Sequence, residues 1–304
     1  MPSRDFSQLR VVVTGREGQV VRSLLERGQA DGYAVIAVGR PELDLARPET
    51  ALEALRNYSP DVVVNAAAYT AVDKAESEPE AALLVNGEGA SAVAEAAARL
   101  AKPVIQISTD YVFDGSSPRA YRPADSTSPI GAYGRSKLAG ERGVAAATAD
   151  HAILRTAWVY SPFGANFVKT MLRLAATRDE VSVVDDQFGC PTEALAMAEG
   201  ILSVARNLAD QPGNVAFRGT FHMTGAGDVT WAGFAEAVFA ESAARGGPHA
   251  AVKRITSDQF PTAAKRPKNS RLDCATLATS HGVALPAWQV SLRGCVARLL
   301  ETGA

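Results

Sequence analysis

Residues 10–21 read RVVVTGREGQVV, and this stretch decides the fold class. The β-branched run Arg10–Thr14 is typical of a strand, and the residues from Gln19 onward are typical of a helix. Gly15 and Gly18, between the two, let the backbone turn tightly and approach a pyrophosphate, which binds free N–H groups at a helix N-terminus. Val21 stands where a third glycine would complete the pattern. Alone, the motif also fits an ordinary tight turn before a helix.

The composition sets limits on the class of protein. The 304 residues carry a formal net charge of −2, so nothing attracts nucleic acid or an anionic membrane globally, and phosphate recognition must be local. The three cysteines form no CxxC pair and join no histidine cluster, which predicts neither a disulfide nor a metal site. The N-terminal segment lacks the apolar core of a signal peptide, and no run approaches the roughly 18 apolar residues of a membrane span. We therefore expect a cytoplasmic protein.

Short apolar runs alternate with longer Ala- and Leu-rich segments over the first two-thirds of the chain. Near-continuous runs such as DVVVN (61–65) predict strands that are covered on both faces. The alternation predicts right-handed βαβ units in an α/β fold with a doubly wound, mostly parallel sheet of the Rossmann type. The expected strands are 10–14, 33–38, 61–66, 103–108, 152–157 and 181–184, and the expected helices are 19–26, 48–57, 80–100, 133–147, 166–176 and 231–245.

The last third of the chain has longer loops, a turn-rich stretch at 224–228 and a basic stretch at 264–272. This change predicts a dinucleotide-binding domain over residues 1–157 and a smaller lobe, mainly for substrate, over 158–304. Segments near 185–210 are expected to return to the first domain. A lobe at the carboxyl edge of the sheet would form a cleft, where open α/β sheets bind ligands.

The end of the second expected strand bears on cofactor choice. No acid stands at its tip to bind the ribose hydroxyls of NAD, whereas Arg40 can pair with the 2′-phosphate of NADP. We expect NADPH, with NADH as the alternative. Asp44 and Leu45 are expected beside the adenine, although Asp44 also fits a helix cap. The expected cofactor-binding residues are Gly15, Glu17, Gly18, Gln19, Val20, Arg40, Asp44, Leu45, the small residues Ala66, Ala67 and Ala68, and Tyr133 and Lys137.

Two further stretches carry the chemistry: Ser108-Thr109-Asp110 after the fourth strand, and YGRSK at 133–137. Tyr133 and Lys137 are four residues apart, so a helix places the phenol and the ammonium on one face. The ammonium stabilises a developing phenolate and so eases proton donation to a carbonyl oxygen during hydride delivery. The hydroxyl of Thr109, or that of Ser108, would polarise the same oxygen. In this order behind a dinucleotide turn, the group predicts a nicotinamide-dependent reductase.

These stretches resemble the extended short-chain dehydrogenase/reductase superfamily and, within it, the dTDP-4-dehydrorhamnose reductase family. The matching segments run in order over nearly the whole chain, and they include GREGQV, AAAYTAVDKAESEPE, ISTDYVFDG, YGRSKLAGE and RPKNSRLD. The resemblance implies reduction of the C4 keto group of dTDP-4-dehydro-6-deoxy-L-mannose to dTDP-L-rhamnose by NAD(P)H. It assigns catalysis to Thr109, Tyr133 and Lys137, and substrate binding to Thr109, Asp110, Tyr111, Tyr133, Trp158 and Arg271.

The resemblance leaves several residues with two readings. Thr70, Asp73 and Lys74 are expected to shape the cleft. The basic residues Lys265, Arg266, Lys268 and Arg271 fit either the substrate diphosphate or a solvated loop, and Arg271 is preferred among them. Some relatives are dimers bridged by magnesium, but Glu193 and Glu199 stand at a different spacing here. We therefore expect no metal site, with magnesium left open, and a monomer or a homodimer.

Two other functions fit the same motifs. A non-catalytic regulatory subunit could keep the dinucleotide fold, although a scaffold does not require Thr109, Tyr133 and Lys137 together. A sibling nucleotide-sugar epimerase would keep NAD tightly bound. The intact set of three favours the reductase.

Overall fold

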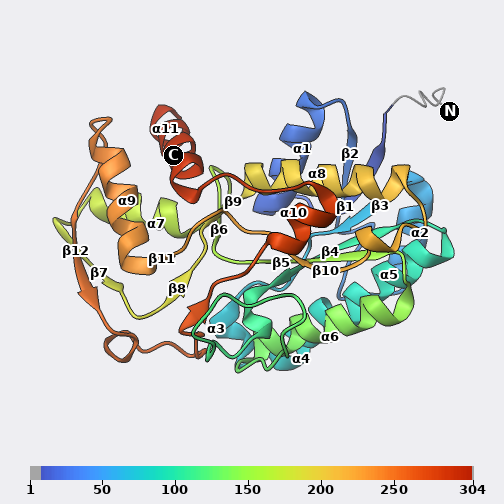
Figure 1. The fold of residues 1–304 in the computed structure, drawn as a ribbon, viewed down its shortest axis with the longest axis horizontal. Helices are drawn as coiled ribbons and strands as arrows, with labels where there is room; N and C mark the ends of the chain where they lie inside the picture. Colours follow the sequence, from blue (N-terminus) through green and yellow to red (C-terminus); the bar gives the residue numbers. More distant parts are fainter. Residues whose placement is uncertain (1–7, 303–304) are drawn as a thin grey trace.

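The computed structural model describes residues 8–302 and is built around a six-stranded sheet in which all neighbouring strands are parallel (Figure 1). The strand order is β10-β5-β4-β3-β1-β2, so the direction of winding reverses between β1 and β3. Ligands bind at such a reversal, beyond the carboxyl ends of the strands. The expected doubly wound α/β fold is confirmed. The strands are β1 (Arg10–Thr14), β2 (Ala34–Val38), β3 (Val62–Asn65), β4 (Val104–Thr109), β5 (His151–Thr156) and β10 (Gly219–His222).

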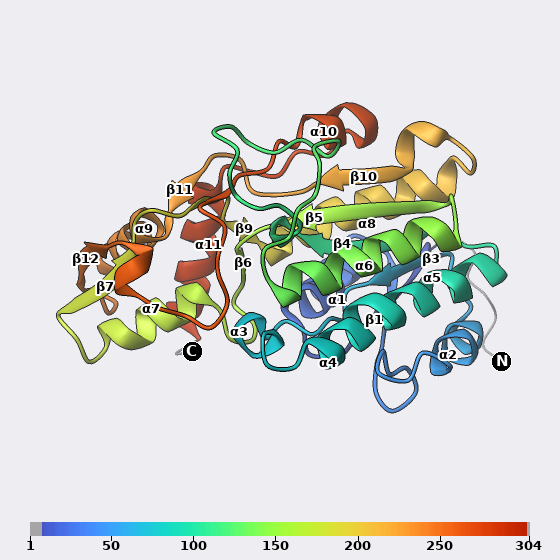
Figure 2. The ribbon, with the colours of Figure 1, turned by 90° about the horizontal axis from the view of Figure 1, so that it is seen from below.

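Helices cover both faces of this sheet. Val11 and Val13 of β1 pack in one buried cluster and Val12 in another, because successive side chains of a strand point to opposite faces. Figure 2 shows α5 and α6 along one face of the sheet, with α1 and α8 on the other side in Figure 1. One face carries α1 (Gln19–Ala30) and α8 (Ala194–Asp210), with α10 (Ala275–His281) at its edge; the other carries α2 (Thr50–Tyr58), α5 (Gly89–Arg99) and α6 (Ala132–Ala147).

The helix expected over 80–100 is divided. A single π-helical turn, Leu84–Glu88, separates α4 (Pro79–Leu83) from α5. The side chain of Asn86 in this turn accepts a hydrogen bond from the Tyr69 N–H at 2.8 Å and donates to the Tyr69 carbonyl at 3.0 Å. The turn therefore anchors the loop that follows β3, which also includes the short helix α3 (Val72–Ala75).

The prediction that strand 181–184 joins the main sheet is wrong, because β7 (Glu180–Val184) pairs instead with β12 (Ala251–Ile255). Its side chains alternate between exposed and buried, as in a strand covered on one face only. The sixth place in the main sheet belongs to β10, beside β5.

The second lobe has its own hydrophobic cluster, around Phe234, Trp288 and Leu292. Its helices are α7 (Phe167–Ala175), α9 (Trp231–Ala243) and α11 (Trp288–Glu301), seen on the left of Figure 1. Short strands join the lobes: β6 (Val159–Tyr160) pairs with β9 (Thr192–Glu193), and β8 (Phe188–Gly189) lies between β11 (Val229–Thr230) and β13 (Asn269–Ser270). Over residues 8–302, no helix combines the length and the apolar character needed to cross a membrane.

Candidate active site

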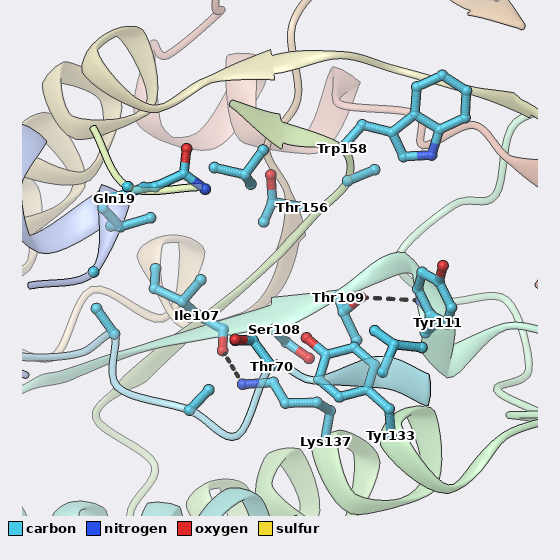
Figure 3. Close-up of a pocket in the computed structure, with 18 of the residues that line it drawn as sticks. Gln19, Thr70, Ile107, Ser108, Thr109, Tyr111, Tyr133, Lys137, Thr156 and Trp158 are labelled. Carbon is cyan, nitrogen blue, oxygen red and sulfur yellow. Dashed lines mark hydrogen bonds between the residues drawn. The ribbon is translucent and has the colours of Figure 1, made fainter. Parts of the chain in front are cut away.

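A cavity of about 530 Å³ lies where β1, β3, β4 and β5 end and where the second lobe begins (Figure 3). It is the site expected for a doubly wound sheet. Many residues singled out in the sequence line it: Glu17, Gly18, Gln19, Val20, Ala66, Ala68, Thr70, Thr109, Asp110, Tyr111, Tyr133, Lys137 and Trp158.

The glycine turn after β1 forms one end of the cavity. Gly15 has a φ of +97°, and a Cβ there would approach Val21 and Ala67, so a larger residue would be strained. Gly18 precedes α1 with no side chain capping the helix, which leaves N–H groups of the first turn available to an anion. Val21, in place of the third glycine, is buried and packs toward the same turn.

Gln19 connects the turn to the second lobe. Its Oε1 accepts hydrogen bonds from Ser161 Oγ at 2.8 Å and Asn166 Nδ2 at 3.0 Å. The loop between those two residues brings Gly164 and Ala165 into the cavity wall. Sequence reasoning missed this loop, although the glycine in SPFGAN was a signal for a turn.

Tyr133 and Lys137 both reach into the cavity from α6 (Figure 3). Gly134 lets the helix come close to the segment after β4, because a Cβ there would lie 2.2 Å from the Tyr111 carbonyl oxygen. Glu76 Oε1 accepts a 2.7 Å hydrogen bond from the Ala132 N–H in the first turn of the helix. Lys137 Nζ donates a 2.7 Å hydrogen bond to the Ile107 carbonyl oxygen, so the ammonium is anchored to β4.

Burial sets the protonation states of this pair. Burial raises the pKa of Tyr133 above its usual value, and the charge of Asp110 raises it further, so the phenol is protonated at neutral pH. Burial lowers the pKa of Lys137 to about 8, against the opposing effect of Glu141. A protonated phenol beside an ammonium can donate a proton and stabilise the phenolate that results.

Thr109, Asp110 and Tyr111 follow one another at the end of β4. Thr109 Oγ1 donates a 3.0 Å hydrogen bond to Asp110 Oδ1 and accepts one of 3.2 Å from the Tyr111 N–H. The Tyr111 ring stands edge-on to the Tyr133 ring, with centroids 5.6 Å apart. Burial raises the pKa of Asp110 to about 6, since the hydrogen bond from Thr109 offsets only part of the desolvation.

Trp158 forms the wall on the side of the second lobe. Its backbone has a φ of +50°, and its ring stacks on Trp231 of α9 with centroids 3.5 Å apart. A Cβ at Gly189 would lie 2.3 Å from the indole, so only glycine leaves room for this ring.

Comparison with known proteins agrees with this geometry. The family model described as the RmlD substrate binding domain matches residues 9–301. The dTDP-4-dehydrorhamnose reductase of Sinorhizobium fredii is 48% identical over 295 residues, which cover 97% of this chain and 99% of that protein. The chain belongs to the dTDP-4-dehydrorhamnose reductase family. This confirms the resemblance drawn from the motifs, and with it the class of enzyme, an oxidoreductase that uses a nicotinamide dinucleotide.

Solved structures extend the comparison. A dTDP-4-dehydrorhamnose reductase from Clostridium acetobutylicum superposes with a TM-score of 0.88 at 35% identity, covering 96% of this chain and 100% of that one. The dTDP-4-dehydrorhamnose reductase from Bacillus anthracis, solved in complex with NADP, superposes with a TM-score of 0.88 at 32% identity. The match covers 96% of this chain and 99% of that one.

Six of the residues expected to bind ligand lie outside the wall of the large cavity. Asp44 Oδ1 accepts a 3.0 Å hydrogen bond from the Ala46 N–H, and Leu45 is buried beneath α5. Arg271 donates to the Pro118 carbonyl at 2.7 Å and to Asn269 Oδ1 at 2.8 Å. Its side chain faces a second cavity, of about 360 Å³. The other three are Gly15, where an added Cβ would lie 3.5 Å from Ala67, Ala67 itself, and Arg40, which is exposed after β2.

The carboxylates considered for a metal have other partners in this member of the family. Glu193 Oε2 accepts a 2.7 Å hydrogen bond from the Ala196 N–H at the start of α8. Glu199 forms a 3.0 Å ion pair with Arg27. Among residues 8–302, no group of three or more His, Cys, Asp or Glu side chains is arranged to hold a metal ion.

Proposed function

We propose that this chain reduces the C4 keto group of dTDP-4-dehydro-6-deoxy-L-mannose to dTDP-L-rhamnose, with NADPH as reductant and Tyr133 as proton donor. The observation that carries the proposal is the convergence of Thr109, Tyr133 and Lys137 on one cavity that also contains the glycine turn. Relatives over nearly the whole chain are named dTDP-4-dehydrorhamnose reductase.

The residues at the glycine turn fit a dinucleotide. The uncapped first turn of α1 offers N–H groups to a pyrophosphate, and Gly15 and Gly18 keep the approach free of side chains. Ala66 and Ala68 leave room beside the backbone after β3. The cofactor, when bound, supplies the hydride. Glu17, Gln19, Val20 and Lys137 complete the proposed binding set.

The proton comes from this chain. Tyr133 Oη donates it to the C4 oxygen, and the Lys137 ammonium stabilises the phenolate that remains. Thr109 holds the same oxygen in place through its hydroxyl. Ser108 also lines the cavity, but it is the weaker alternative because its hydroxyl donates to Glu141 Oε1.

The cofactor preference rests on the end of β2. Arg40 is exposed there and can reach a 2′-phosphate, and its charge favours NADPH. Glu42, the acid nearest in sequence, forms a 2.6 Å ion pair with Arg16 and is therefore partly neutralised.

The sugar lies on the other side of the cavity in this proposal. Trp158 offers an apolar ring face to the C6 methyl group, and Asp110 and Tyr111 face the sugar from the end of β4. The residues after 158 thus act mainly as the substrate lobe, and residues 1–157 mainly as the dinucleotide domain.

The test is turnover of the enzymatically prepared dTDP-4-keto-6-deoxy-L-sugar, followed by oxidation of NADPH and of NADH, with Tyr133→Phe in parallel. We expect dTDP-L-rhamnose as the product and a loss of about a thousandfold or more in the Phe variant, since the proton donor is removed. A protein that binds dinucleotide but oxidises neither cofactor would contradict the proposal and favour the regulatory subunit. NAD that copurifies with the protein and is regenerated would favour an epimerase.

A further inference from the structure

Glu141 is a buried carboxylate on the same helix as Tyr133 and Lys137. Only 4% of the residue is exposed, and its partner Arg155 is 5% exposed. Arg155 Nε donates to Glu141 Oε1 at 2.9 Å and Arg155 Nη2 donates to Oε2 at 2.7 Å. Ser108 Oγ donates to Oε1 at 2.5 Å. The two carboxylate oxygens of Glu141 therefore accept three hydrogen bonds from residues of β4 and β5.

Each element that Glu141 joins also carries a residue of the site. Ser108 stands in β4 between Ile107, whose carbonyl anchors Lys137, and Thr109, whose hydroxyl faces the cavity. Arg155 stands in β5, directly before three residues of the cavity wall, Thr156–Trp158. The spacing of four residues places Glu141 one turn beyond Lys137 on α6. One carboxylate thus sets how α6, β4 and β5 meet behind the cavity.

Stability alone does not account for such a pair. Removing two charges from water costs several kcal/mol per ion, and buried ion pairs can often be replaced by apolar residues without loss of stability. What the bidentate contact supplies is a fixed direction and distance. Arg155 also lies over the Phe113 ring, which extends the arrangement toward the loop after β4.

We propose that Glu141 is a positioning residue for the reduction, which holds Thr109 (through Ser108) and Lys137 in the arrangement that proton transfer requires. The inference rests on the proposed function, because it presumes that Thr109, Tyr133 and Lys137 carry out the reaction.

The charges around Lys137 define the expected effect on pH dependence. Tyr133 and Glu141 stand on its own helix, and Asp110 follows β4. From β5, Arg155 is paired with Glu141, and His222 of β10 is buried beside Arg155 with a pKa lowered to about 3. Glu141 is the charge that raises the pKa of Lys137 against burial. Without the charge of Glu141, Lys137 loses its proton at lower pH.

The experiment compares the pH profile of kcat in the wild type, in Glu141→Gln and in the double variant Glu141→Gln/Arg155→Gln. The double variant contains no unpaired buried charge, so it tests the same idea in a protein that keeps its fold. We expect the alkaline limb to move to lower pH in Glu141→Gln, since a nearby opposite charge is lost, and to move less in the double variant, since the charge of Arg155 is removed as well. We expect kcat to fall about tenfold or more, while the Kd for NADP⁺, measured by fluorescence titration, stays near that of the wild type.

Two single substitutions separate positioning from a purely structural role. Ser108→Ala keeps the ion pair and removes the hydroxyl that links Glu141 to β4, so kcat should fall about fivefold with the alkaline limb unchanged. Asp150→Asn breaks the 2.8 Å pair with Arg218 at the far end of β5, and should lower stability without changing kcat or the limb.

Equal kcat and equal pH profiles in the wild type, Ser108→Ala and the double variant would overturn the role of Glu141. A wild type that fails to reduce the keto-sugar would instead overturn the proposed function, so the two failures are distinguishable.

Discussion

Arg266 donates hydrogen bonds of 2.7 and 3.2 Å to the carboxylate of Asp73 and so joins the loop before β13 to α3, beside the cavity. The same guanidinium donates to the Ala264 carbonyl at 3.1 Å, and the Ala264 N–H donates to Asp73 Oδ1 at 3.0 Å. The Arg266 guanidinium holds the pKa of Asp73 below its usual range. The sequence offered Arg266 for the substrate diphosphate and Asp73 for the cleft; the structure pairs them.

We predict that Arg266→Ala and Asp73→Asn both raise the KM for the sugar nucleotide, by about fivefold, because a partly exposed ion pair contributes about 1 kcal/mol. Steady-state kinetics at saturating NADPH measures the KM of each variant for the sugar nucleotide. Lys74→Gln, which breaks the 2.9 Å pair with Glu78 on the neighbouring surface, is the matched control and should leave KM unchanged. If Arg266 instead binds the diphosphate directly, Asp73→Asn would lower KM rather than raise it.

Cofactor choice can be tested at one exposed residue. We predict that Arg40→Ala lowers the ratio of kcat/KM for NADPH to that for NADH by about tenfold, since a charge-assisted contact with a phosphate is lost. Arg47→Ala is the control, because Arg47 is an arginine in the same loop whose charge is paired with Asp44, at 3.7 Å. The ratio of kcat/KM for NADPH to that for NADH is measured in both variants. An unchanged ratio in Arg40→Ala would remove Arg40 from the proposed cofactor site.

His222 predicts how stability changes with acid. Burial and the nearby charge of Arg155 lower its pKa to about 3, from an ordinary value of 6.5. Between these values the unfolded chain binds a proton that the folded protein does not, so stability is complete above the ordinary pKa and falls as pH decreases. From pH 6.5 to pH 5 the loss attributable to this residue is about 2 kcal/mol.

Urea unfolding at both pH values measures this loss. His222→Gln should reduce the dependence on pH by about that amount, whereas the exposed His249→Gln should not. Equal pH dependence in the wild type and His222→Gln would show that His222 is not the group responsible.

The parts of the fold that the sequence predicts are those set by local patterns. β1, the glycine turn and α1 follow from RVVVTGREGQVV, and α6 follows from a helix that carries Tyr133 and Lys137 on one face. Thr109 lies at the end of β4 and the cavity forms there, as expected, because parallel strands end at one edge of the sheet.

The parts that escaped prediction depend on long-range pairing. The local pattern favours β7 (EVSVV) over β10 (GTFH) as a strand of the main sheet, and only the pairing of β10 with β5 and of β7 with β12 decides otherwise. Gln19 meets Ser161 across 142 positions, and Arg271 turns toward Asn269 and Pro118 rather than toward the large cavity. The π-helical turn at Leu84–Glu88 likewise reflects the contact of Asn86 with Tyr69.

The most direct test of the account is a single turnover with NADPH that carries deuterium at the transferable C4 position, in the wild type and in Tyr133→Phe. We predict dTDP-L-rhamnose with deuterium at C4 of the sugar from the wild type, detected by mass spectrometry and NMR. We also predict little product from the Phe variant, which should bind NADP⁺ as the wild type does. A product without deuterium at C4, or equal yields from the two proteins, would contradict it.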